Sequence, residues 1–141
     1  MHRVIPEYTN FAIHSSVFFL SAWVPANLPT MQHEINDKIS LEMGRRVAAR
    51  LREDPALLQI ARDNLARWLR LNADAPVLIR SYREWLAILE RPIGDICHIL
   101  CADTEEGRRL RQNSPFAGVL PPSEVWSIKA AIRQRHAKTA A

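Results

Sequence analysis

The chain has 141 residues, a length that normally forms one domain around a single hydrophobic core. Its 48% hydrophobic and 24% charged residues are typical of a globular protein, and only four glycines argue against a turn-rich β architecture. The formal net charge of +4 keeps both acidic proteins and nucleic acid as partner classes. Because acidic residues are interleaved with the basic ones, local ion pairs on solvated helices are the simplest explanation for this charge.

The N-terminal residues 1–37 are expected to form an extension that is weakly structured or packs on a partner. Residues 11–24 are the most apolar stretch, but they include one histidine and three serines. About 20 apolar residues are needed to cross a bilayer, so this stretch is too short. The prolines that follow it make a poor signal-peptide cleavage site. We therefore expect no membrane span and a cytoplasmic protein.

Apolar residues recur at helical spacing from residue 38 to residue 136, which predicts a compact all-α bundle of five to six short helices. The first helix is expected over residues 39–53, with Asp37 or Ser40 as its cap. Its polar face carries the densest basic cluster of the chain, which consists of Arg45, Arg46, Arg50 and Arg52.

Prolines mark the starts of the next three predicted helices. Asp54 followed by Pro55 is typical of an N-cap and a first turn, and it predicts a second helix to residue 71. Proline at residues 76 and 92 opens a third helix and a short fourth one.

The last third of the predicted domain contains two more helices. Asp103 stands three positions before Glu106, which predicts a capping box at the start of a fifth helix. A proline-bounded loop at residues 113–122 is expected either to pack on the core or to face a partner. The final helix should begin at residue 122 or 123 and give way to a basic tail at residues 137–141.

No pattern of residues indicates catalysis. A glycine-rich phosphate loop, a serine nucleophile elbow and the common zinc-binding patterns are all missing, and the five histidines are scattered. Cys97 and Cys101 are too few for a disulfide framework and are expected to be two buried thiols. We therefore expect no enzyme activity, no cofactor and no metal site.

Three tryptophans admit two interpretations. Trp68, Trp85 and Trp126 fit the spacing of core positions on helices. An exposed tryptophan beside arginine is, however, a typical anchor of a protein interface. The sequence leaves both interpretations open for each of them.

The most specific stretch of the chain is RRLRQNSPFAGVL at residues 108–120, followed by Glu124 and Trp126. Together with the helical pattern over residues 47–128, it resembles a family of small bacterial proteins encoded in toxin–antitoxin operons. The neighbouring toxin is commonly of the AbiEii nucleotidyltransferase type. The resemblance implies an antitoxin-like protein that binds and neutralises a cognate toxin enzyme, and it supplies no catalytic residues.

The partner surface is expected where a basic helix end meets the apolar loop. An apolar anchor surrounded by arginines would pair with acidic groups or occupy a phosphate-binding cleft. The expected partner-binding residues are Arg108, Arg109, Arg111, Ser114, Phe116 and Trp126. Two alternatives stay open: a regulator that binds DNA or RNA through the basic face of the first helix, and a non-catalytic assembly protein.

Overall fold

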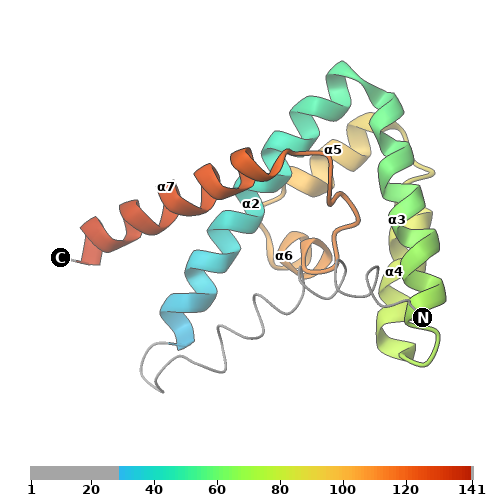
Figure 1. The fold of residues 1–141 in the computed structure, drawn as a ribbon, viewed down its shortest axis with the longest axis horizontal. Coiled ribbons are helices and arrows are strands. Elements are labelled where there is room, and N and C mark those ends of the chain that lie inside the picture. Colours follow the sequence, from blue (N-terminus) through green and yellow to red (C-terminus); the bar gives the residue numbers. More distant parts are fainter. Residues whose placement is uncertain (1–28, 141) are drawn as a thin grey trace.

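The computed structural model describes residues 29–140, so the apolar stretch at residues 11–24 lies outside the described residues. Within the described range the chain forms six α-helices, one 3-10 turn and no strand, which confirms the all-α prediction (Figure 1). In chain order these elements are α2 (Pro29–Glu53), η1 (Pro55–Leu57), α3 (Leu58–Leu71), α4 (Pro76–Ile88), α5 (Ile93–Cys101), α6 (Glu105–Arg111) and α7 (Pro122–Ala140).

Helix α2 begins at Pro29, well before the predicted start at residue 39. Its additional turns are stabilised by a side-chain hydrogen bond of 3.4 Å from Gln32 to Asn36 and by packing of Ile35 against the core. The part of the predicted extension at residues 29–37 is therefore helical. Asp37 and Ser40, the two predicted caps, lie inside the helix.

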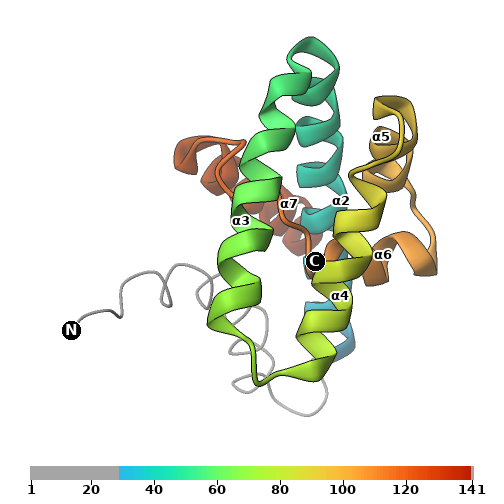
Figure 2. The ribbon, with the colours of Figure 1, turned by 90° about the vertical axis from the view of Figure 1, so that its right-hand side faces the viewer.

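Helix α2 packs against α5, α6 and α7, and its closest approach is to α5 (Figures 1 and 2). A Cβ atom at Gly44 would lie 2.3 Å from the carbonyl oxygen of Leu100, so only glycine permits this spacing. Ala48 and Leu51 of α2 are fully buried in the resulting core. Cys97 of α5 is buried with them, and its thiol donates to the Ala48 carbonyl oxygen at 3.5 Å.

Helices α3 and α4 form a hairpin that adds two buried tryptophans to the core. Trp68 packs on Tyr82 with 5.5 Å between ring centroids, and the indole N–H of Trp85 donates to the Leu110 carbonyl oxygen at 2.9 Å. The predicted cap at Asp54 is confirmed, because its carboxylate accepts from the Ala56 N–H at 3.2 Å. The first turn after this cap is the 3-10 turn η1, and α3 follows it.

The start of α6 differs from the predicted capping box. Thr104, not Asp103, is the N-cap, and its hydroxyl accepts from the Gly107 N–H at 3.0 Å. Glu105 and Glu106 lie in the first turn, where their negative charges interact favourably with the positive end of the helix dipole.

Helix α7 extends through most of the predicted basic tail and ends at Ala140. No glycine or proline follows Pro122, and alanine, lysine, arginine and glutamine are strong helix formers. Ile128 and Ile132 bury one side of this helix in the core. The opposite side faces solvent, and Trp126 is 67% exposed there.

Candidate functional site

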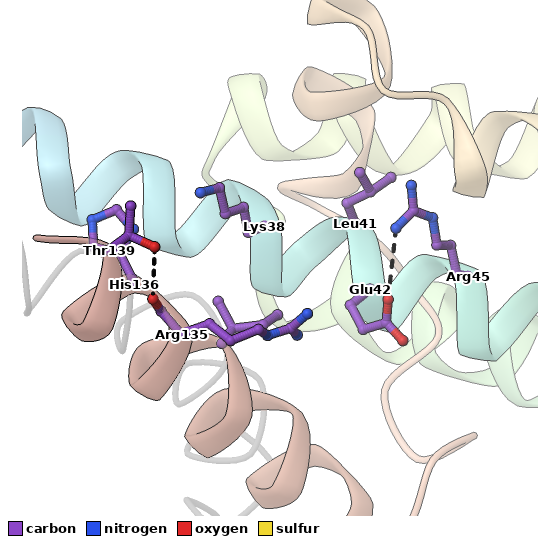
Figure 3. Close-up of a pocket in the computed structure, with 8 residues that line it drawn as sticks. Lys38, Leu41, Glu42, Arg45, Arg135, His136 and Thr139 are labelled. Carbon is purple, nitrogen blue, oxygen red and sulfur yellow. Dashed lines mark hydrogen bonds and ion pairs between the residues drawn. The ribbon is translucent and has the colours of Figure 1, made fainter.

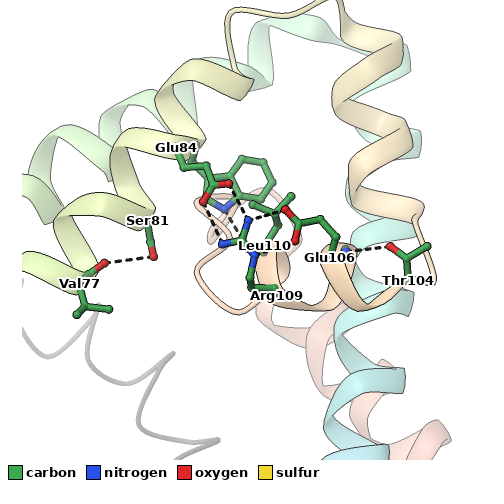
Figure 4. A network of polar contacts seen from close by, with 9 residues as sticks. Val77, Ser81, Glu84, Thr104, Glu106, Arg109 and Leu110 are labelled. Carbon is green, nitrogen blue, oxygen red and sulfur yellow. Dashed lines mark hydrogen bonds and ion pairs between the residues drawn. The ribbon is translucent and has the colours of Figure 1, made fainter.

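Arg108 and Arg109, two residues of the predicted partner surface, are engaged in ion pairs within the chain. Arg109 binds the carboxylates of Glu106 and Glu84 at 2.6 and 2.7 Å, which raises the pKa of its guanidinium (Figure 4). Arg108 lies 3.4 Å from Asp103 and 3.9 Å from Asp37. Arg109 therefore joins α6 to α4, and Arg108 joins α6 to α2.

Arg111 is a buried structural residue with only 6% of its surface exposed. Its Nε donates to the Ser40 hydroxyl at 3.0 Å, and its Nη1 donates to the Ala102 carbonyl oxygen at 2.7 Å. Nη1 also lies 3.4 Å from the Leu100 carbonyl oxygen. Burial lowers the pKa of this guanidinium. A side chain that holds α2, α5 and α6 together in this way is not available to a partner.

The proline-bounded loop is packed on the core. Phe116 is buried with its ring edge-on to Trp85, 5.7 Å between centroids. The side-chain amide of Asn64 donates to the carbonyl oxygens of Pro115 at 2.8 Å and Ala117 at 2.9 Å. Gly118 adopts a positive φ of 97°, which glycine tolerates without strain. Phe116 is therefore a core residue in this conformation.

Ser114 and Asn64 also bear on how the proline-bounded loop is held. Ser114 is half-buried, and its backbone N–H donates to the Arg111 carbonyl oxygen at 3.2 Å. Asn64, which holds the loop, stands three positions after Ala61 and four before Trp68, so its spacing places a polar residue on the apolar side of α3. Its partners lie 51 and 53 residues away, so no local pattern indicates them.

The basic strip of α2 is divided between two sides of the helix. Arg46 and Arg50 both bind Glu124 at the start of α7, and the Arg46 contact is 3.2 Å. Burial would raise the pKa of the Glu124 carboxyl, but the hydrogen bonds from these two guanidiniums lower it overall. Arg45 and Arg52 are seven residues apart, which places them together on a different side, and both are exposed.

An exposed tryptophan with two nearby cations marks the solvent side of α7. Lys129 Nζ lies 5.7 Å from the centroid of the Trp126 ring, which is within cation–π range. Burial and the neighbouring charge of Arg133 lower the pKa of Lys129. Lys129 and Arg133 follow Trp126 by three and seven positions and so share its side of the helix. We call Trp126, Lys129 and Arg133 the Trp126 surface.

A second feature of the surface is an open groove of about 280 Å³ between α2 and α7 (Figure 3). Three cationic side chains, one histidine and one carboxylate contribute to its walls. We call it the α2–α7 groove, and it is lined by Lys38, Leu41, Glu42, Arg45, Ile132, Arg135, His136 and Thr139. Only Arg45 among these residues belongs to the predicted nucleic-acid set.

The described residues contain no group of three or more histidine, cysteine or acidic side chains placed to hold a metal ion. Cys97 and Cys101 are free thiols, the first buried and the second half-buried. Burial raises the pKa of the Cys97 thiol, which disfavours the reactive thiolate form. No helix in residues 29–140 is long and apolar enough to span a bilayer.

The described residues form an all-α fold with an exposed tryptophan on its last helix and a basic groove between that helix and α2. No protein-family model matches the chain, and no curated protein or solved structure shows significant similarity to it. Function must therefore be argued from the chemistry of the two surfaces.

Proposed function

We propose that this chain is a non-catalytic, antitoxin-like protein that binds a cognate toxin enzyme through the Trp126 surface. The observation that carries this proposal is the 67% exposure of the Trp126 side chain on a regular helix. Tryptophan and arginine are enriched among the residues that dominate the energetics of protein interfaces. Here an indole stands beside Lys129 and Arg133, so the surface suits an apolar pocket with an acidic rim.

The attachment of α7 to the rest of the chain favours such a role. Glu124 is held by Arg46 and Arg50 immediately before Trp126, and Ile128 and Ile132 are buried in the core. The helix backbone that carries Trp126 is thus ordered before any partner arrives. Binding therefore loses less conformational entropy than it would with an unfolded segment.

The identity of the partner as a toxin rests on the resemblance over residues 47–128, which includes Trp126. In its most specific stretch, residues 108–120, Arg111 and Phe116 are buried and Arg108 and Arg109 are ion-paired. These four side chains therefore have structural roles within the fold. Among the expected partner-binding residues, Trp126 is retained, and Lys129 and Arg133 join it as contact residues. A toxin of the nucleotidyltransferase type is the first partner to test.

The experiment is co-expression of the full chain with the toxin-like product of an adjacent gene, followed by co-purification and measurement of affinity. We expect Trp126→Ala to weaken the complex by at least about tenfold, since truncated anchor residues commonly cost 2 kcal/mol or more. Val77→Ala is the matched control, because Val77 on α4 is an apolar side chain that is 71% exposed. It should leave the affinity unchanged.

Two results would contradict the proposal. If the wild-type chain neither binds the adjacent gene product nor restores growth of cells that express it, the antitoxin-like role is wrong. If the wild-type complex forms but Trp126→Ala and Val77→Ala bind equally well, the role stands and the Trp126 surface is not the contact.

A further inference from the structure

The α2–α7 groove brings together positive charges that no carboxylate among residues 29–140 neutralises. Lys38 and Arg135 face it from α2 and α7, and neither has a carboxylate within 4.0 Å among residues 29–140. The one carboxylate of the groove, Glu42, is already shared by Arg45 at 3.7 Å and Arg46 at 2.9 Å. The groove therefore presents a surplus of positive charge.

The charge pattern of α7 extends this surplus beyond the groove. No acidic residue follows Glu124 in the sequence, whereas four basic ones do, namely Lys129, Arg133, Arg135 and Lys138. None of these four makes an ion pair in the described part of the chain. The arginines of α6 differ, because Arg108 and Arg109 are each paired with two carboxylates. Unbalanced charge on one element attracts polyanions.

The floor of the groove indicates which kind of polyanion fits. Leu41 and Ile132 form its apolar part, but both are already buried by neighbouring side chains. A peptide side chain would gain little apolar contact there, so the attraction is mainly electrostatic. A nucleic-acid strand has a negative charge on every nucleotide and binds by neutralisation of its phosphates by lysine and arginine. We propose that the α2–α7 groove binds the phosphodiester backbone of a nucleic-acid strand.

This site is separate from the Trp126 surface. Arg135 follows Trp126 by nine positions, which is two and a half turns at about 3.6 residues per turn. The two side chains therefore leave opposite sides of α7. A toxin bound at Trp126 leaves the groove accessible, and the inference does not depend on the proposed function.

The test is fluorescence anisotropy of the full chain with labelled oligonucleotides of about 20 nucleotides, as single-stranded RNA, single-stranded DNA and duplex DNA, between 50 and 200 mM salt. We expect binding that weakens steeply with salt. The double variant Lys38→Glu/Arg135→Glu should lose at least about tenfold in affinity. Its salt slope should fall by about 0.7 to 0.9 for each phosphate contact removed.

The matched control is Arg80→Glu/Arg83→Glu, which changes the net charge equally at two exposed arginines of α4 that form no ion pair within residues 29–140. It should reduce affinity by less than about threefold. The variant Lys38→Gln/Arg135→Gln removes the two positive charges of the groove without adding negative ones. Circular dichroism verifies that each variant is folded. The three nucleic acids distinguish a single strand from a duplex as the preferred source of the phosphates.

Three outcomes would overturn the proposal: no binding by the wild-type chain, equal loss in the groove and α4 variants, or preferential binding of polyglutamate over an oligonucleotide of equal charge. The last outcome would assign the groove to an acidic polypeptide. Co-purification of the groove variant with the toxin is measured in parallel, because it reports on the antitoxin-like role alone. Failure of this inference and failure of that role are therefore distinguishable.

Discussion

The guanidinium of Arg111 lies between α2, α6 and the end of α5, where it donates to one hydroxyl and two carbonyl oxygens. Its charge is desolvated, and the three acceptors replace water at Nε and Nη1, whereas the buried Nη2 has no hydrogen-bond partner among residues 29–140. The same residue type at Arg108 meets carboxylates at the surface. Residues that are three apart in the sequence thus have different roles because the surrounding helices provide different partners.

At the residue scale, Arg111→Lys should lower the free energy of unfolding by about 1–3 kcal/mol. A lysine ammonium cannot reproduce the planar fork of donors, so some buried acceptors lose their hydrogen bonds. Urea denaturation followed by circular dichroism measures this loss. The control Arg108→Lys affects surface ion pairs and should cost about 0–1 kcal/mol. Equal losses in the two variants would show that Arg111 does not hold the helices together.

Local sequence signals at the element scale located most helices but not all of their ends. Asp54 and the prolines at residues 55, 76, 92 and 122 mark helix starts because N-caps and first-turn prolines act within a few residues. The start of α2 escaped prediction, since its first turns lack a clear cap and depend on packing of Ile35. Helix α7 continues to Ala140, beyond the expected boundary at residue 136, because charged residues that are strong helix formers do not end a helix.

The contact between α2 and α5 provides a test at the element scale. A methyl group at Gly44 would meet the backbone oxygen of Leu100, which cannot move without displacing a helix. We expect Gly44→Ala to destabilise the protein by about 1–3 kcal/mol, as overpacking commonly does. Thermal unfolding monitored by circular dichroism measures the change.

Gly94 on α5 supplies the opposite case, because a Cβ atom there has no neighbour within 4 Å. Gly94→Ala should raise stability by up to about 1 kcal/mol, since alanine restricts the unfolded chain more than glycine does. A result in which Gly44→Ala is as well tolerated as Gly94→Ala would contradict the close packing of α2 on α5.

On the scale of the whole molecule, stability and surface charge are located in different parts of the chain. The buried core extends no further along the sequence than Ile132. Removal of residues 134–141 should therefore leave the cooperative unfolding transition intact, with a loss of less than about 1 kcal/mol from fraying of α7. The same truncation removes Arg135 and His136 from the groove.

We expect the truncated protein to retain toxin binding through Trp126 and to lose at least about tenfold in affinity for oligonucleotides. Differential scanning calorimetry and the anisotropy assay measure these two consequences independently. A large fall in the unfolding temperature would show that residues 134–141 contribute to the core. Unchanged oligonucleotide affinity would instead locate the phosphate contacts elsewhere.

Periodicity, caps and prolines act over a few residues, so the amino-acid sequence alone was enough to predict the all-α class and the approximate positions of the helices. Which basic residues lack an ion pair depends instead on contacts between helices that are distant in the sequence. The acidic partners of Arg109 and Arg46 include Glu84 and Glu124, 25 and 78 residues away in the sequence. In the folded chain, ion pairs neutralise arginine charges of the predicted partner surface, and Arg111 and Phe116 are buried. Trp126 and the α2–α7 groove with Lys38 and Arg135 are exposed to solvent.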